Sequence, residues 1–369
     1  MMSRALLASL LLASTSIGCS SDPVTSAGPA STIDSSTEDA AADTLVAPAN
    51  DSSSPLDSAP LDAPGLDVTA DGAPSDTFTA AGPHAVAKKD AKIGSTSVHL
   101  VYPTTAPPAA GFPGVAFAHG FQLKPGDYDK LLEHFASFGY VVVSTDFPGT
   151  LFSIDHNDVA KALIAARQAM AAGSIAGLPK VDGARIAVSG HSLGGKGSVM
   201  AILADPAFVA GLVFDPVDGN PGNPLGGGPD AQHPKLNPTE VAKVTVPMGY
   251  FGATASHCGS TACAPTGLDA ATFFASTKSS TPHYLWIVND FGHMQFLDNP
   301  ACGFACSACA AGKAPIDPRR TAIAATAVAF LKRHVDGDTT AQRWLDGDKR
   351  DAYVASAILW SGTGTPPCP

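Results

Sequence analysis

The chain has 369 residues, of which 45% are hydrophobic, and a formal net charge of −11 at pH 7. Eleven of its 33 acidic residues lie in residues 20–83, which hold no Lys or Arg. The 22 acidic residues beyond position 83 face 21 basic ones, so that part is nearly neutral. Nothing basic enough to hold nucleic acid remains, and binding of nucleic acid is excluded.

Residues 1–19 are typical of a bacterial export signal. Arg4 precedes the apolar run 5–13, which is too short to span a bilayer. The end of the segment, Ser16-Ile-Gly-Cys19, resembles the lipobox of bacterial lipoproteins, which implies a lipid on Cys19 and a membrane anchor. Leucine is usual where this chain has Ser16, so plain secretion stays open. No later segment is apolar enough to predict a transmembrane helix.

Residues 20–83 consist almost wholly of Ser, Ala, Pro, Asp, Thr and Gly, with Phe78 as their single aromatic residue. Such a segment buries too little apolar area to offset the entropy lost on ordering. We therefore predict a disordered acidic linker over 20–83 and a catalytic domain over 84–369.

Apolar strand-like and helix-like segments alternate from residue 84 onward. This alternation, with strands apolar on both faces, indicates an α/β fold with a mainly parallel sheet covered by helices on both sides. Segment 97–102 alternates like an edge strand, and the Gly- and Pro-rich segment 216–240 is expected to form loops over the rim of the site. Strands are predicted at 97–102, 114–118, 140–145, 185–189, 208–214, 244–251 and 283–288, and helices at 128–137, 157–172, 195–204 and 319–334.

The motif Gly190-His-Ser192-Leu-Gly194-Gly falls between the predicted strand 185–189 and the helix 195–204. A serine between a strand and a helix sits on a sharp, strained turn, and glycines two residues to either side let the chains pass closely. A bare G-x-S-x-G arises often by chance as a plain turn, but the strand–turn–helix context favours a nucleophile. We predict that Ser192 is the nucleophile of a serine hydrolase.

The serine needs a histidine as base and a carboxylate to orient that histidine. His293 follows the last predicted strand, where the base of an α/β-hydrolase is expected. Elsewhere, His233, His257, His283 and His334 are interpreted as surface or packing residues.

The acid is harder to place, because no carboxylate follows the strand that ends near 252–254. Asp215 ends the preceding strand, at the rim where ligands bind in such sheets. Asp215 is the predicted acid, with Asp218 as the alternative; a turn aspartate before proline is the structural interpretation. Asp290 is expected to cap its loop.

Two backbone N–H groups should bind the oxyanion. One belongs to Leu193, directly after the nucleophile. The other belongs to Phe121, because strand 114–118 leads into His119-Gly120, where glycine allows close approach to a ligand.

Six cysteines remain after Cys19. An even number in an exported chain predicts up to three disulfides, whose pairing the sequence leaves open. The rival interpretation is a thiolate metal site that uses the closely spaced cysteines. The six are Cys258, Cys263, Cys302, Cys306, Cys309 and Cys368.

Several of these segments resemble the chlorophyllases and occur in that family's order over residues 97–300. The family has arginine after the nucleophile, where this chain has Leu193. The resemblance implies an α/β-hydrolase fold, a triad of Ser192, Asp215 and His293, and ester cleavage without a metal or organic cofactor. The matching segments are Phe117-Ala-His-Gly-Phe121, Gly190-His-Ser-Leu-Gly-Gly-Lys196, Asp215-Pro-Val-Asp-Gly219, Cys263-Ala-Pro-Thr-Gly267 and Asp290-Phe-Gly-His-Met-Gln-Phe-Leu-Asp298.

The function expected from the sequence is therefore a chlorophyllase-like serine esterase that acts on a hydrophobic, lipid-like or small-molecule ester. A lipase, a polyester hydrolase or an acyltransferase would use the same machinery. A non-catalytic binding lipoprotein displayed on the cell surface is the alternative from another class.

Overall fold

The centre of the fold is one eight-stranded sheet with the strand order β1-β2-β4-β3-β5-β6-β7-β8. The computed structural model describes residues 78–149, 154–219, 229–259, 263–264, 269–301, 304–362 and 364–369. Cys19, its leader and most of the predicted linker lie outside these residues. The strands are β1 (Val86–Ile93), β2 (Thr96–Pro103), β3 (Phe112–Ala118), β4 (Val141–Thr145), β5 (Val181–His191), β6 (Gly211–Phe214), β7 (Met248–Ala253) and β8 (His283–Val288).

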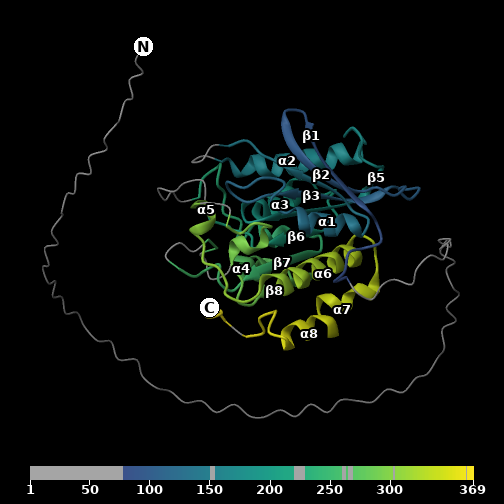
Figure 1. Cartoon of the computed structure of the whole chain (residues 1–369). Helices are drawn as coiled ribbons and strands as arrows, with labels where there is room; N and C mark the ends of the chain where they lie inside the picture. Colours follow the sequence, from purple (N-terminus) through teal and green to yellow (C-terminus); the bar gives the residue numbers. More distant parts are fainter. Residues whose placement is uncertain are drawn as a thin grey trace, which may run out of the picture. The chain divides into compact units, whose positions relative to one another are not determined.

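Only β2 runs against its neighbours; the strands from β4 to β8 are parallel. Helices lie on both sides of the sheet (Figure 1). The α-helices are α1 (Asp129–Ser137), α2 (His156–Ala171), α3 (Leu193–Ala204), α4 (Asp269–Ser276), α5 (Phe304–Ser307), α6 (Ile316–His334), α7 (Gln342–Leu345) and α8 (Asp348–Ala355), and the short 3-10 turns are η1 (Val241–Lys243), η2 (His293–Phe296) and η3 (Thr339–Ala341).

Two apolar cores separate the sheet from its helices. Successive β3 residues point to opposite faces. Val115 and Phe117 join the core under α1 and α6, whereas Ala116 and Ala118 join the core under α2 and α3. A sheet buried on both sides accounts for the uninterrupted apolar strands and confirms the predicted α/β-hydrolase-type fold.

The ends of the helices follow from local chemistry. The side chain of Asp155 accepts from the N–H of Asn157, 2.8 Å away, and caps α2. After α1 the chain turns at Gly139, whose φ of 95° suits glycine. Both boundaries lie within one residue of the predicted ends.

The edge of the sheet differs from the prediction. The alternation of segment 97–102 predicts an edge strand, but β2 lies between β1 and β4, and β1 forms the edge. Strand β1 reads Val-Ala-Lys-Lys-Asp-Ala-Lys-Ile and is at most half-buried. Its charged residues leave no apolar run that would predict a strand. Lysine-rich edge strands are common because the charges oppose pairing with another strand.

The described domain also begins before residue 84. The ring of Phe78 packs 5.6 Å from that of Phe138 and 5.4 Å from that of Trp344, between centroids. The N–H of Gly82 donates to the Ser137 hydroxyl. Residues 78–83, assigned to the linker by composition, therefore contact the core, because one aromatic residue found a site among helices distant in sequence.

Disulfides join Cys258 to Cys368 and Cys263 to Cys309, and Cys306 is disulfide-bonded as well. Cys302 lies outside the described residues. The bonded sulfurs are no longer thiolates, so the rival metal site is not formed by them. Within the described part of the chain, no helix is long and apolar enough to cross a membrane.

The Cys258–Cys368 bond closes a loop with a sequence separation of 110 residues. A cross-link of this span restricts the unfolded chain strongly. We expect replacement of both cysteines by serine to lower the free energy of unfolding by about 2–4 kcal/mol in urea denaturation. Equal urea midpoints for wild type and variant, each purified under non-reducing conditions, would contradict this.

Candidate active site

The C-terminal ends of the central strands lie level with one another. Ala118 of β3 pairs with Gly190 of β5, and His191 at the end of β5 pairs with Phe214 at the end of β6. The residues that follow β3, β5 and β6 therefore emerge side by side at one rim of the sheet. This register brings sequence-distant loops together.

Ser192 occupies the turn between β5 and α3. Its φ is 57° and its ψ −118°, a strained conformation for a residue with a side chain. A Cβ on Gly190 would collide with the backbone of Gly194, and one on Gly194 with the backbone of Ala118. The motif therefore requires both glycines for close packing, as predicted.

Asp215 and His293 form a buried pair. Asp215 follows β6, and its Oδ2 lies 2.7 Å from Nδ1 of His293, which opens the η2 turn after β8. The two side chains are 0% and 5% exposed. A carboxylate that accepts from Nδ1–H leaves Nε2 as the basic nitrogen. The Asp215 carboxylate can therefore orient the ring of His293 and stabilise a positive charge on it.

A backbone hydrogen bond joins Ser192 to the residue that precedes Asp215. The N–H of Ser192 donates to the carbonyl of Phe214, the residue before Asp215, at 3.0 Å. The ring of His191 lies 4.5 Å from that of His293, between centroids. The Ser192 hydroxyl itself makes no hydrogen bond within the described part of the chain. Contacts between nucleophile and base are often loose in ligand-free sites.

The alternative acid, Asp218, contacts other residues than His293. Its carboxylate accepts from the backbone N–H groups of Leu236 and Asn237 and pairs with the fully buried Lys196, 3.4 Å away. Asp218 thus ties Leu236 and Asn237, here called the rim segment, to Lys196 of α3. Asp290, in turn, accepts from the backbone N–H of Lys313 at 2.7 Å.

The two predicted oxyanion donors flank the nucleophile. Leu193 is the first residue of α3, so its N–H has no acceptor within the helix. Phe121 follows Gly120, where an added Cβ would come within 3.1 Å of the Ser192 Cβ. No acceptor for either N–H occurs among the described residues.

The predicted oxyanion turn is braced by His119. Its Nδ1 donates to the carbonyl of Gly120 at 2.7 Å, and its Nε2 lies 3.1 Å from Oδ1 of Asp146. Its ring stacks on Phe147 with centroids 4.2 Å apart. The contact with His119 lowers the pKa of the Asp146 carboxyl, so the charged carboxylate is favoured beside the ring.

Ser256 is a contact that sequence analysis missed. Its hydroxyl donates to Oδ2 of Asp215, the same oxygen that accepts from His293. Ser256 follows β7, in the stretch 254–258 that holds no carboxylate. A hydroxyl at this place in the chain was the available signal, because it can reach a carboxylate on the neighbouring strand end.

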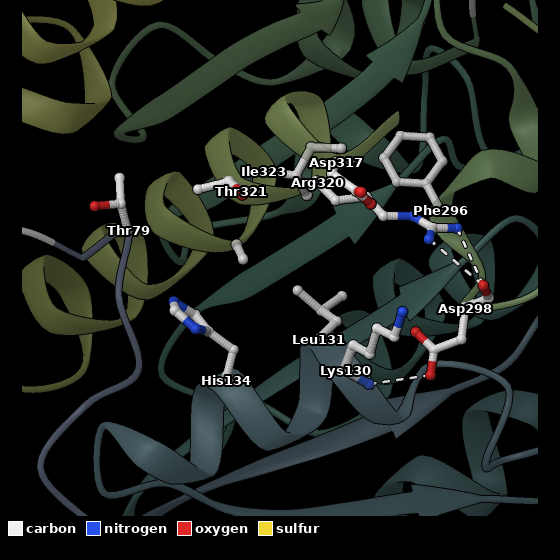
Figure 2. Close-up of a pocket in the computed structure, with 11 residues that line it drawn as sticks. Thr79, Lys130, Leu131, His134, Phe296, Asp298, Asp317, Arg320, Thr321 and Ile323 are labelled. Carbon is white, nitrogen blue, oxygen red and sulfur yellow. Dashed lines mark hydrogen bonds between the residues drawn. The ribbon is translucent and has the colours of Figure 1, made fainter. Parts of the chain in front are cut away.

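A cavity of about 320 Å³ lies between α1 and α6, and Figure 2 shows its lining. Phe296 lines it, but Ser192, Asp215 and His293 do not. Arg320 donates there to the carbonyls of Gln295 and Leu297 and so holds the η2 turn that starts with His293.

Residues 78–355 match the sequence model of the chlorophyllase family. The chain belongs to the chlorophyllase family. It is 31% identical over 238 residues to chlorophyllase-1, chloroplastic, of Citrus unshiu, a match that covers 61% of this chain and 69% of the relative. The identity to chlorophyllase-1 of Arabidopsis thaliana is 28% over 281 residues, covering 69% and 81%.

The chain is also similar to a hydrolase of Streptomyces coelicolor. The chain is 26% identical over 282 residues to the bis(hydroxyethyl) terephthalate hydrolase of Streptomyces coelicolor, covering 74% of this chain and 75% of the relative. Together with the chlorophyllase family match, this similarity supports an ester hydrolase.

The two candidate acids can be told apart by comparing the activity of their asparagine variants. We expect Asp215→Asn to lower kcat about a thousandfold or more, because the amide cannot stabilise an imidazolium at His293. Asp218→Asn should lower kcat less than about tenfold and act mainly on stability, since it weakens the Lys196 pair. Steady-state ester hydrolysis and thermal unfolding of both proteins test this; the larger kcat loss in Asp218→Asn would reverse the assignment.

The buried His156 at the start of α2 should make the stability of the fold depend on pH. His156 is buried beside His233, and desolvation lowers its pKa to about 3. The folded state keeps His156 neutral while the unfolded chain takes up a proton below about pH 6.5, so stability is full above pH 6.5 and falls toward pH 3.

We expect His156→Phe to reduce the slope of unfolding free energy against pH by up to about 1.4 kcal/mol per pH unit between pH 6 and 4. Urea unfolding at several pH values measures both slopes. Comparison at pH 7.5 removes the packing effect of the substitution. An unchanged slope would count against a neutral buried His156.

Proposed function

We propose that the chain is a serine esterase that cleaves hydrophobic carboxylic esters through an acyl-enzyme intermediate. The observation that carries the proposal is the 2.7 Å contact of Asp215 with Nδ1 of His293 beside the strained turn of Ser192. A nucleophile, a base and a buried carboxylate are the minimum set for this chemistry.

In the proposed first step, Ser192 Oγ attacks the ester carbonyl and His293 Nε2 takes its proton. Asp215 stabilises the imidazolium, and the N–H groups of Phe121 and Leu193 hold the oxyanion. The tetrahedral species collapses, His293 returns the proton to the departing alkoxide, and an alcohol leaves. Water, deprotonated by His293, then attacks the acyl carbonyl. The second tetrahedral species collapses, His293 returns the proton to Ser192 Oγ, and the acid is released.

The substrate class follows from the relatives and from the residue after the nucleophile. Leu193 is fully buried and contributes no charge at the turn. The terephthalate-ester relative favours a compact aromatic diester as the second candidate beside a chlorophyll-type ester. Hydrolysis rates on short acyl esters, bis(hydroxyethyl) terephthalate, triglycerides and chlorophyll would separate an esterase, a polyester-type hydrolase, a lipase and a chlorophyllase.

We also propose that the protein is exported, and that a lipid on Cys19 anchors it through the acidic linker. Disulfides are typical of oxidising compartments, and the Cys258–Cys368 and Cys263–Cys309 bonds are consistent with export. The lipid itself rests on the lipobox-like segment that ends at Cys19.

Ser192→Ala tests the nucleophile. We expect ester turnover to fall to the uncatalysed rate plus a small residual, and fluorophosphonate labelling to disappear, in a protein that unfolds at the wild-type temperature. Ser189→Ala is the matched control, because its hydroxyl is buried in β5, three residues earlier, and bonds none of the residues that the structure describes. Turnover or labelling retained by Ser192→Ala would reject the proposal, and no labelling of the wild type would favour a binding lipoprotein.

A further inference from the structure

One buried hydroxyl contacts both of the turns that form the candidate site. Tyr128 precedes α1, and its side chain is fully buried. Its hydroxyl accepts from the N–H of Gly120 at 3.1 Å and lies 2.8 Å from Nδ1 of His191. Gly120 is the residue before Phe121, and His191 is the residue before Ser192. Each contact is therefore one residue from a group with a proposed catalytic role.

The hydrogens in this network have one consistent arrangement. The Gly120 N–H can only donate, so it uses a lone pair of the Tyr128 oxygen. The single hydroxyl hydrogen is then available to Nδ1 of His191, which accepts as a neutral imidazole. Burial lowers the pKa of His191 well below its usual range and raises that of Tyr128 well above its usual range. Both groups keep these roles across the working pH range of an esterase.

The packing around the hydroxyl makes its position matter. An added Cβ on Gly120 would lie 3.1 Å from the Ser192 Cβ and 3.2 Å from Nδ1 of His191, so the two turns are in close contact. The Tyr128 ring is held by Phe117 of β3, with centroids 4.9 Å apart. The ring of His191 in turn lies 4.5 Å from that of His293. A rigid ring thus presents one hydroxyl at the junction of both turns.

We propose that Tyr128 is a positioning residue that sets the distance between the oxyanion N–H of Phe121 and the nucleophile Ser192. It does so by bonding Gly120 on one side and His191 on the other. The inference rests on the proposed esterase function. It predicts a role in transition-state stabilisation, because the oxyanion donor is useful only when placed to within a fraction of an ångström.

The test is Tyr128→Phe, which keeps the ring and removes the hydroxyl. We expect kcat to fall about 10- to 100-fold while KM changes less than about threefold, since the loss concerns the transition state. A trifluoromethyl ketone that matches the acyl group forms an oxyanion on Ser192, and its inhibition constant should rise by a similar factor. Affinity for the product alcohol, which has no oxyanion, should stay within about twofold of wild type.

Tyr250→Phe is the matched control. Tyr250 is equally buried, and its hydroxyl bonds Thr277 at 2.8 Å on the core side occupied by α4. The Tyr250→Phe variant should lower the unfolding temperature about as much as Tyr128→Phe does, and its kcat should stay within about twofold of wild type. A second variant, His191→Phe, removes the acceptor from the other end of the network and should reproduce the kcat loss if Tyr128→Phe fails to fold.

The outcomes separate the two proposals. Wild-type kcat and ketone affinity in Tyr128→Phe would overturn the positioning role while the esterase function stands. An equal kcat loss in Tyr250→Phe would reduce the effect to general stability and overturn the role as well. If wild type hydrolyses no ester of the panel, or Ser192→Ala keeps the activity, the esterase proposal fails first.

Discussion

The site depends on one buried carboxylate held at the end of a short strand. Asp215 is fully buried, and a charge in such a place needs partners that compensate for lost water. His293 and Ser256 both bond its Oδ2, and its N–H donates to the carbonyl of Phe251 on β7. These three partners come from segments after β8, after β7 and from β7 itself. The carboxylate thus links the segments after β7 and β8, and the backbone N–H of Asp215 links the end of β6 to β7 itself. The carboxylate also fixes the ring that is proposed to act as base.

Other polar groups at the rim do not contact the candidate triad but hold the loops that carry it. Asp218 and Lys196 hold the rim segment against α3, and Arg320 holds the η2 turn through backbone carbonyls. Tyr128 and His119 brace the turn before Phe121 from two sides. Each of these groups is buried or half-buried, so its hydrogen bonds are shielded from competing water. The candidate catalytic groups lie in loops, but the loops are held by polar contacts to the covered sheet.

The fold was predictable where apolar patterns are strong. The strands from β3 to β8 and the helices α1, α2, α3 and α6 follow from runs and spacings that burial on both faces of a sheet requires. The pattern failed for β1, whose lysines suit an exposed edge, and for Phe78, whose ring packs on Phe138 at the end of α1 and on Trp344 of α7. Neither a charged edge strand nor a lone aromatic residue has a local signature, because its burial is decided by distant segments.

By itself the sequence determined the chemistry available to this protein: a serine on a glycine-flanked turn, a histidine after the last strand and an aspartate at a strand end. The motif itself requires glycine at Gly190, since a Cβ there would collide with the backbone of Gly194 within the same turn. Only the tertiary structure decided between Asp215 and Asp218 as the partner of His293, because they are three residues apart in the chain and differ only in what surrounds them. It alone also disclosed Tyr128 and Ser256 as hydrogen-bond partners around the site. Side-chain contacts across a parallel sheet depend on strand register, and register is set by packing of the whole domain rather than by any short motif.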